Sequence, residues 1–160
     1  MCRVAGIWTR RDGQDLAAVC TTMRDAMSAG GPDDAGLFMD ANSGIALGHR
    51  RLSVIDLTET GRQPMTDASG RFTICYNGEA YNYRELRAEL EELGFKFRGT
   101  SDTEVVLNAF AAWGVKSVER LIGMFAFALW DGLERRLYLV RDRIGVKPLY
   151  YYHEDGVFAF

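Results

Sequence analysis

Short apolar runs dominate both ends of the chain, whereas its middle carries helical periodicity. Runs of β-branched and other apolar residues, bounded by Gly, Asp or Asn, predict strands at residues 3–8, 36–39, 45–47, 72–76, 125–130, 137–140 and 150–152. A further alternating run at residues 156–160 looks like a strand at the end of the chain. Strands before and after a helical block predict an α+β fold in which helices stack on sheets.

Three stripes of apolar residues at three- and four-residue spacing predict helices that face a core. The stripes are Leu16, Val19, Met23 and Met27; Leu86, Leu90 and Leu93; and Val106, Ala109, Phe110 and Trp113. Asn82 and Ser101 each precede a glutamate by three residues, which is the spacing of a capping box and predicts two helix starts. Gly94 and Gly114 follow the last two stripes and predict where those helices end.

The composition is that of one domain of 160 residues with 19 basic and 22 acidic side chains and a net charge of −3. Basic residues form no long cluster, which argues against nucleic acid as the main partner. No apolar run reaches the length of a transmembrane helix, and the first residues lack the pattern of a signal peptide. The cysteines, Cys2, Cys20 and Cys75, have neither disulfide-framework nor zinc-site spacing, so we expect no metal site and a reducing, cytoplasmic location.

Cys2 stands directly behind Met1, and removal of Met1 would make it the N-terminal residue. A terminal cysteine carries both a thiol nucleophile and an α-amine that can accept the thiol proton, so no histidine is required. The alternative is that Cys2 belongs to a frayed terminus without a role. His49 and His153 lack a second metal-type ligand at helical or strand spacing, which favours structural or exposed positions for both.

Asn77 and Gly78 follow the predicted strand 72–76 and precede Glu79. Asn-Gly is the strongest short signal for a two-residue hairpin turn, which is one interpretation. The segment after Glu79 enters a predicted helix, and this favours a strand-to-helix turn instead. Such a turn can present the Asn77 side-chain amide and the Gly78 N–H together as donors for a developing oxyanion.

Arg50 and Arg51 are adjacent in an extended stretch, so their side chains are expected on opposite faces. They are either a surface basic pair or include one inward arginine that needs a carboxylate. Asp102 stands in the first turn of a predicted helix, where the helix dipole alone favours an acid. The functional alternative is that Arg51 and Asp102 bind the carboxylate and the ammonium of an amino-acid substrate.

Two loops invite a functional interpretation. Residues 28–34 contain paired glycines and Pro32, but a helical stripe precedes them, and the proline removes an N–H that a phosphate cradle would use. A tight turn is therefore predicted there. Residues 141–150 are charged, which is typical of an ion-pair network in a loop and equally of a face toward a neighbouring domain.

Several motifs that are weak one by one occur together in a specific order. They are Met1-Cys2, Arg51-Leu52-Ser53, Tyr76-Asn77-Gly78-Glu79, Tyr81-Asn82, Ser101-Asp102-Thr103-Glu104, and residues 123–128 and 141–150. In this arrangement the chain resembles, nearly end to end, the N-terminal glutaminase domain of the glutamine-hydrolysing asparagine synthetases, a class II glutamine amidotransferase. The resemblance implies a four-layer α-β-β-α sandwich of the Ntn-hydrolase type, with two mainly antiparallel sheets, over residues 1–160. The strand-like end of the chain is expected of a domain excised from a longer protein, with a C-terminal synthetase domain in cis.

The resemblance also implies roles for individual residues. Cys2 is implied as the nucleophile and its α-amine as the base, which hydrolyse L-glutamine through a γ-glutamyl thioester. Asn77 and Gly78 are implied as the oxyanion hole. The further substrate contacts that it implies are Arg51 on the carboxylate, Asp102 on the ammonium, Glu79, and the backbone of Val54 and Ile55. No cofactor is implied for this half-reaction, whereas ATP and Mg²⁺ would belong to the synthetase domain.

One loop departs from the family pattern. Family members usually read Arg-His-Arg-Gly-Pro-Asp where this chain has residues 28–33, so the basic side chains are absent. We expect ammonia supply for ATP-dependent asparagine synthesis. Two rivals stay open: the same glutaminase with another acceptor, such as a sugar carboxylate, and a degenerate binding or regulatory domain, which would apply if Met1 is retained. A homodimer is compatible with the sequence.

Overall fold

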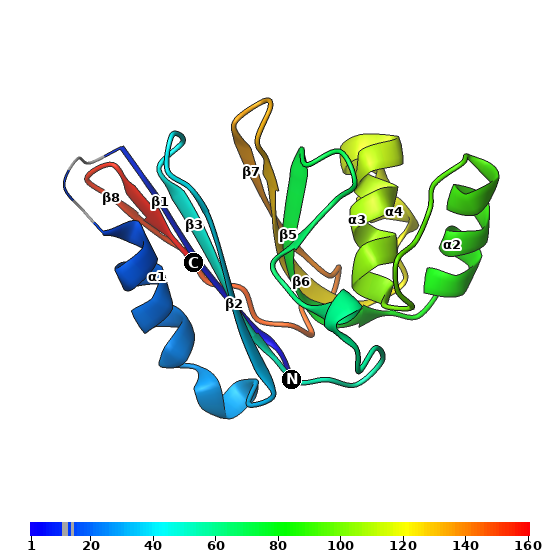
Figure 1. Ribbon diagram of the computed structural model, residues 1–160, viewed down its shortest axis with the longest axis horizontal. Helices are drawn as coiled ribbons and strands as arrows, with labels where there is room; N and C mark the ends of the chain where they lie inside the picture. Colours follow the sequence, from blue (N-terminus) through cyan, green and yellow to red (C-terminus); the bar gives the residue numbers. More distant parts are fainter. Residues whose placement is uncertain (11–12, 14) are drawn as a thin grey trace.

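The computed structural model describes residues 1–10, 13 and 15–160 and contains two antiparallel sheets between two helical layers (Figure 1). The first sheet has the strand order β2-β3-β1-β9-β8 and the second β4-β5-β6-β7. The strands are β1 (Arg3–Thr9), β2 (Asp34–Asp40), β3 (Ile45–Arg51), β4 (Met65–Thr66), β5 (Phe72–Ala80), β6 (Gly123–Asp131), β7 (Arg136–Arg141), β8 (Tyr152–Glu154) and β9 (Val157–Ala159). The predicted α-β-β-α sandwich with two antiparallel sheets is confirmed.

The outer layers are formed by α1 on the first sheet and by α2, α3 and α4 on the side of the second (Figure 1). Their bounds are α1 (Leu16–Asp25), α2 (Tyr83–Glu92), α3 (Asp102–Trp113) and α4 (Ser117–Arg120), with single 3₁₀ turns η1 (Ser28–Gly30), η2 (Glu59–Gly61) and η3 (Gly114–Lys116). The turn η1 lies within the loop for which a tight turn was predicted.

The two predicted capping boxes have different outcomes. The Ser101 hydroxyl accepts a hydrogen bond from the Glu104 N–H and caps α3. Asn82 occupies the N-cap position of α2, but its side chain makes no capping bond. It donates instead to the Arg120 carbonyl and accepts from the Ile122 N–H, so the capping box predicted there is wrong. The amide ties the start of α2 to the segment that enters β6.

An apolar layer between the sheets holds them together, with Ile45 and Leu47 from β3 facing Cys75 and Trp130 from the second sheet. Trp8 packs edge-to-face on Trp130, with ring centroids 5.5 Å apart. A second apolar cluster lies between the second sheet and its helices and includes the predicted core residues of α3. Two positions of the predicted stripes do not face the core: Val19 and Leu93 are exposed, and Cys20 takes the buried position in α1.

The last strand pair differs in register from the prediction of a strand at 150–152. Asp155 and Gly156 both have positive φ, 50° and 73°, as a tight hairpin turn requires. This turn fixes the pairing of Tyr152–Glu154 with Val157–Ala159 and leaves Tyr150 and Tyr151 outside the sheet. The strand predicted at the end of the chain is present as β9, which pairs with β1. In the described part of the chain, no helix combines the length and the apolar character needed to cross a bilayer.

Candidate active site

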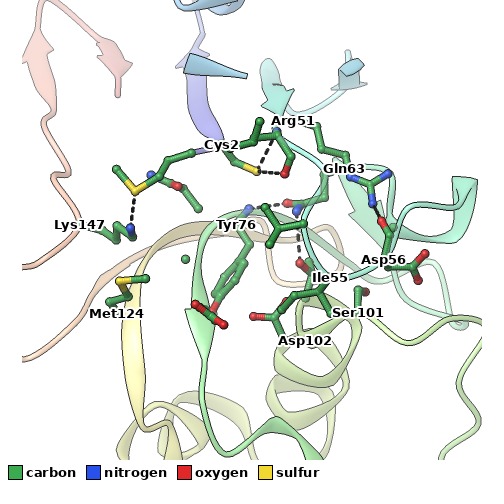
Figure 2. Close-up of a pocket in the computed structure, with 18 residues that line it drawn as sticks. Cys2, Arg51, Ile55, Asp56, Gln63, Tyr76, Ser101, Asp102, Met124 and Lys147 are labelled. Atoms are coloured by element: carbon green, nitrogen blue, oxygen red, sulfur yellow. Dashed lines mark hydrogen bonds between the residues drawn. The ribbon is translucent and has the colours of Figure 1, made fainter. Parts of the chain in front are cut away.

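A cavity of about 240 Å³ next to the N-terminus gathers every site residue that the sequence predicted (Figure 2). These residues are Cys2, Arg51, Val54, Ile55, Asn77, Gly78, Glu79 and Asp102. The remaining lining residues are Met1, Leu52, Asp56, Gly61, Gln63, Tyr76, Ser101, Thr103, Met124 and Lys147. Its walls therefore come from the start of β1, the end of β3 and the loop after it, β5, and the first turn of α3.

Cys2 lies one residue before β1 and is half-buried, with a free thiol. Its Sγ accepts a hydrogen bond from the Leu52 N–H at 3.4 Å and donates to the Leu52 carbonyl at 3.6 Å. Leu52 follows the last residue of β3, so the main chain of the neighbouring strand holds the thiol at the mouth of the cavity. Met1 precedes it, and the Met1 Sδ contacts the Lys147 Nζ.

Asn77 and Gly78 lie inside β5, where they are paired with Ala126 and Phe125 of β6. Neither the hairpin turn nor the strand-to-helix turn predicted for them is formed, because β5 continues to Ala80 and α2 begins only at Tyr83. Pairing with β6 explains the glycine: a Cβ at Gly78 would lie 2.4 Å from the Met124 carbonyl oxygen. Asn-Gly was an ambiguous signal because its usual turn preference is local, whereas this position is set by the neighbouring strand.

The free edge of β5 directs main-chain groups toward the cavity. The Tyr76 N–H donates to the Gln63 Oε1 at 2.6 Å, and the Tyr76 carbonyl bonds the His49 Nε2 at 3.1 Å. The Ala80 N–H donates to the Asp102 Oδ2 at 3.0 Å. Since alternate residues of a strand direct their N–H groups to the same edge, the N–H of Gly78 points there too, between two donors that are already satisfied.

The Asn77 side chain leaves a face of the sheet and not its edge. It shares a face with Cys75, which packs between the sheets, so it points toward the sheet that carries Cys2. Asn77 is only 5% exposed, and within the described residues its amide makes no side-chain hydrogen bond. A buried amide without a protein partner is a donor that is available to a ligand.

Arg51 is the inward arginine of the predicted pair. It is 7% exposed, and its guanidinium donates to the main-chain carbonyls of Asp56 and Thr58. Among the described residues it forms no ion pair with a carboxylate. Arg50 leaves the opposite face of β3, as alternation predicts, but it is not solvated: it donates to the Gly31 carbonyl at 2.9 Å and lies 3.7 Å from Asp25.

Asp102 is the first residue of α3 and is 5% exposed. Burial raises the pKa of its carboxyl group, although hydrogen bonds from the main chain of Ala80 and Thr103 oppose the shift. A cation beside this carboxylate would favour its ionised form. Arg51 and Asp102 thus line one cavity without pairing with each other, which leaves a cationic and an anionic group for an amino-acid ligand.

Asp56 holds the loop that follows β3. Its carboxylate accepts hydrogen bonds from Thr58, Thr60 and the Thr100 N–H just before α3. Burial alone would raise the pKa of Asp56, but these hydrogen bonds outweigh it and hold the pKa well below its usual range. Within this loop Val54 is 72% exposed although it lines the cavity, which is compatible with a contact through its backbone.

Two of the lining side chains that the sequence did not assign to the site are polar and buried, Gln63 and Lys147. Gln63 links β5 to α3, since its Oε1 accepts from Tyr76 and its Nε2 donates to the Thr103 hydroxyl at 3.2 Å. The one local signal at Gln63 in the sequence is that Pro64 follows it in a loop, and this does not predict its hydrogen bonds. Lys147, which is 3% exposed, comes from the charged segment 141–150 and was weighed for a neighbouring domain rather than for this cavity.

The described residues contain no group of three or more His, Cys, Asp or Glu side chains that could hold a metal ion.

Comparison with known proteins assigns the chain to one family. The profile described as "Glutamine amidotransferase domain" matches residues 1–160. The chain belongs to this family. This amidotransferase domain is 45% identical over 140 residues to "Asparagine synthetase [glutamine-hydrolyzing] 3" of Bacillus subtilis, which covers 86% of the chain and 22% of the relative. It is also 39% identical over 140 residues to "Amidase chry2" of Gibberella zeae, which covers 88% of the chain and 21% of the relative.

A solved structure supports the fold of the amidotransferase domain. Glutamine phosphoribosylpyrophosphate amidotransferase from B. subtilis superposes with a TM-score of 0.82 at 19% identity, over 99% of this chain and 41% of the other. The resemblance to class II amidotransferase domains, and in particular to those of asparagine synthetases, is therefore confirmed. The chain spans about a fifth of the length of the curated relatives it matches.

Proposed function

We propose that this domain hydrolyses L-glutamine to glutamate and ammonia through a γ-glutamyl thioester on Cys2, and so supplies ammonia for amide synthesis. The observation that carries the proposal is one cavity that a free thiol, two oppositely charged side chains and two donors without a partner among the described residues line together. Arg51 would bind the substrate carboxylate and Asp102 its ammonium. Glu79 and the backbone of Val54 and Ile55 would complete the contacts.

The reaction needs the α-amine of Cys2 and therefore the removal of Met1. The thiolate attacks the γ-carbonyl carbon while the amine accepts the thiol proton. Asn77 and Gly78 donate to the tetrahedral oxyanion, where each donor is worth about 3 kcal/mol. The amine then protonates the departing ammonia, and water hydrolyses the thioester to release glutamate. These steps use only side chains and main-chain groups of the cavity.

We further propose that a C-terminal synthetase domain in cis consumes the ammonia with ATP and Mg²⁺ to make asparagine in the cytoplasm. The curated relatives named asparagine synthetase support this acceptor. A different acceptor carboxylate is the second candidate, since a relative of similar identity is named as an amidase. Amide formation from aspartate, compared with a panel of sugar and amino-acid carboxylates, separates the two.

Replacement of the nucleophile tests the glutaminase activity. Cys2→Ala is expected to abolish ammonia release from glutamine and to leave the melting temperature unchanged, because the half-buried thiol contributes little packing. Intact mass, measured first, must show a chain without Met1. Full residual activity in the variant would remove Cys2 as the nucleophile. A processed wild-type chain that releases no ammonia would favour the degenerate binding or regulatory domain.

A further inference from the structure

The side chain of Arg3 occupies the space directly over Gly30. A Cβ added at Gly30 would lie 2.5 Å from the Arg3 Nε and 2.7 Å from its Cζ, which is closer than real Cβ atoms approach another atom. At the next position, a Cβ on Gly31 would lie 2.5 Å from the Arg50 main-chain carbonyl. The two glycines therefore allow the η1 turn to lie against the start of β1 and the end of β3.

Arg3 reaches back to the residue that precedes it. Its Nη1 donates to the Cys2 carbonyl at 3.1 Å and approaches the Met1 carbonyl at 3.4 Å. Among the described residues, no carboxylate forms an ion pair with this guanidinium. The carbonyl of Cys2 is thus the nearer of the two main-chain acceptors that the Arg3 guanidinium contacts.

The hydrogen bond from Arg3 to the Cys2 carbonyl affects the direction of the Cys2 nitrogen, because both groups are bonded to the same Cα atom. Leu52 holds the Sγ, and Arg3 holds the carbonyl group. Because the substituents of a tetrahedral carbon have fixed mutual angles, holding two of them leaves one direction for the third, which is the nitrogen. After Met1 is removed, that nitrogen is the free α-amine.

We propose that Arg3 is a positioning residue for the Cys2 α-amine. Gly30 is its complement, because a glycine at this position leaves the space that the Arg3 side chain occupies. The inference rests on the proposed glutaminase function. It also explains the departure of the 28–33 loop from the family pattern: the third position of the loop, usually arginine, is glycine here because a guanidinium from β1 fills that space.

A double-mutant cycle of four proteins, made of the wild type, Arg3→Gly, Gly30→Arg and the double variant, tests the proposal in the protein without Met1. Arg3→Gly is expected to lower kcat for glutamine hydrolysis about tenfold and to change KM less than about twofold, since a misplaced base affects chemistry more than substrate binding. Arg3→Lys, which keeps a donor on a flexible side chain, is expected to recover part of kcat. Arg84→Ala removes an exposed arginine on α2 and serves as the control, with unchanged kcat.

The complement is tested by Gly30→Arg alone and together with Arg3→Gly. Alone, the new side chain collides with Arg3, so both kcat and the melting temperature should fall. In the double variant, the guanidinium is relocated to the loop, and kcat should return to within about threefold of wild type. Effects that simply add in the double variant would overturn the inference, as would an Arg3→Gly variant with wild-type kcat.

Failure of the proposed function would look different. If the processed wild type does not hydrolyse glutamine, the glutaminase proposal fails whatever the variants do. The contact between Arg3 and Gly30 is still measured by the melting temperatures of the same four proteins, because Gly30→Arg should lower the melting temperature only when Arg3 is present. If Gly30→Arg lowered the melting temperature equally in the wild type and in Arg3→Gly, Gly30 would not be the complement of the Arg3 side chain.

Discussion

Arg51 binds main-chain oxygens of the loop that follows its strand, so it has a structural task beside the substrate contact proposed for it. The guanidinium donates to the carbonyls of Asp56 and Thr58, and it is buried in the cavity wall with no carboxylate partner in the part of the chain that the structure describes. Arginine presents its donors in a rigid planar fork, so the same group can hold the loop on one side and a substrate carboxylate on the other. Sequence reasoning anticipated the second task alone.

The Arg51→Lys variant tests whether the planar guanidinium, and not only its positive charge, is needed for the loop contacts and for the proposed substrate contact. Lysine keeps the positive charge but cannot reach two carbonyls and a ligand in the same geometry, so KM for glutamine should rise about tenfold, which corresponds to about 1.4 kcal/mol. The free energy of unfolding should fall by about 1 kcal/mol through the lost hydrogen bonds. Steady-state kinetics and urea unfolding measure both. Arg50→Lys is the matched control and should leave KM unchanged; an unaltered KM for Arg51→Lys would contradict its role in substrate binding.

At the scale of elements, Gln63 connects the two structures that carry the candidate site. Its amide joins the free edge of β5, where Gly78 directs its N–H, to the first turn of α3, where Asp102 begins the helix. Figure 2 shows Gln63 between Tyr76 and this end of α3. One side chain therefore fixes the relative position of a proposed oxyanion donor and a proposed ammonium ligand.

Gln63→Leu should weaken both the fold and the reaction. It leaves the buried Tyr76 N–H without a partner, which costs about 1–3 kcal/mol of unfolding free energy. The strand edge should also shift, so that kcat falls by more than can be explained by the fraction of unfolded protein. Thr66→Val removes a hydroxyl pair between β4 and β5 and is the control for stability alone. Equal kcat in the two variants, after correction for folding, would exclude a role of Gln63 at the site.

At the scale of the whole molecule, the two sheets are joined by polar as well as apolar contacts. His49 on β3 is 1% exposed and reaches across to the Tyr76 carbonyl on β5. Burial lowers the pKa of His49 to about 4, and the nearby positive charge of Arg51 adds to this effect, although the hydrogen bond to Tyr76 opposes it. The imidazole therefore stays neutral in the folded protein at pH values where a free histidine is protonated.

The stability of the protein should consequently fall on acidification between pH 6.5 and pH 4. In that range the unfolded chain binds a proton at His49 and the folded protein does not, so the unfolded state is favoured. The part of the loss that comes from His49 should reach about 3 kcal/mol and should not increase further below pH 4. Urea unfolding across this range should show the slope in the wild type and not in His49→Gln, which keeps a donor for Tyr76. Identical slopes would show that His49 is not the titrating group.

The order of elements and the members of the site were predictable because they depend on local patterns and on motif spacing. Apolar runs bounded by Gly, Asp or Asn identified β1 and the first part of β3, and Ser101 marked the start of α3, which its hydroxyl caps. Asn77-Gly78 was misread as a turn because its pairing partner, β6, lies some fifty residues further along the sequence. Gln63 could not be recognised at all, since its two hydrogen-bond partners come from separate elements.

The proposed nucleophile and the proposed oxyanion donors are carried by different sheets. Cys2 extends from β1 in the first sheet, and Gly78 belongs to β5 in the second. Their separation is therefore set by the thickness of the apolar layer between the sheets, where Trp130 is the largest buried side chain. Interiors are packed too densely to change volume without moving their walls. The interior of this sandwich thus acts as a spacer that sets the distance between the Cys2 thiol and the Gly78 N–H, and residues far from the cavity take part in setting that distance.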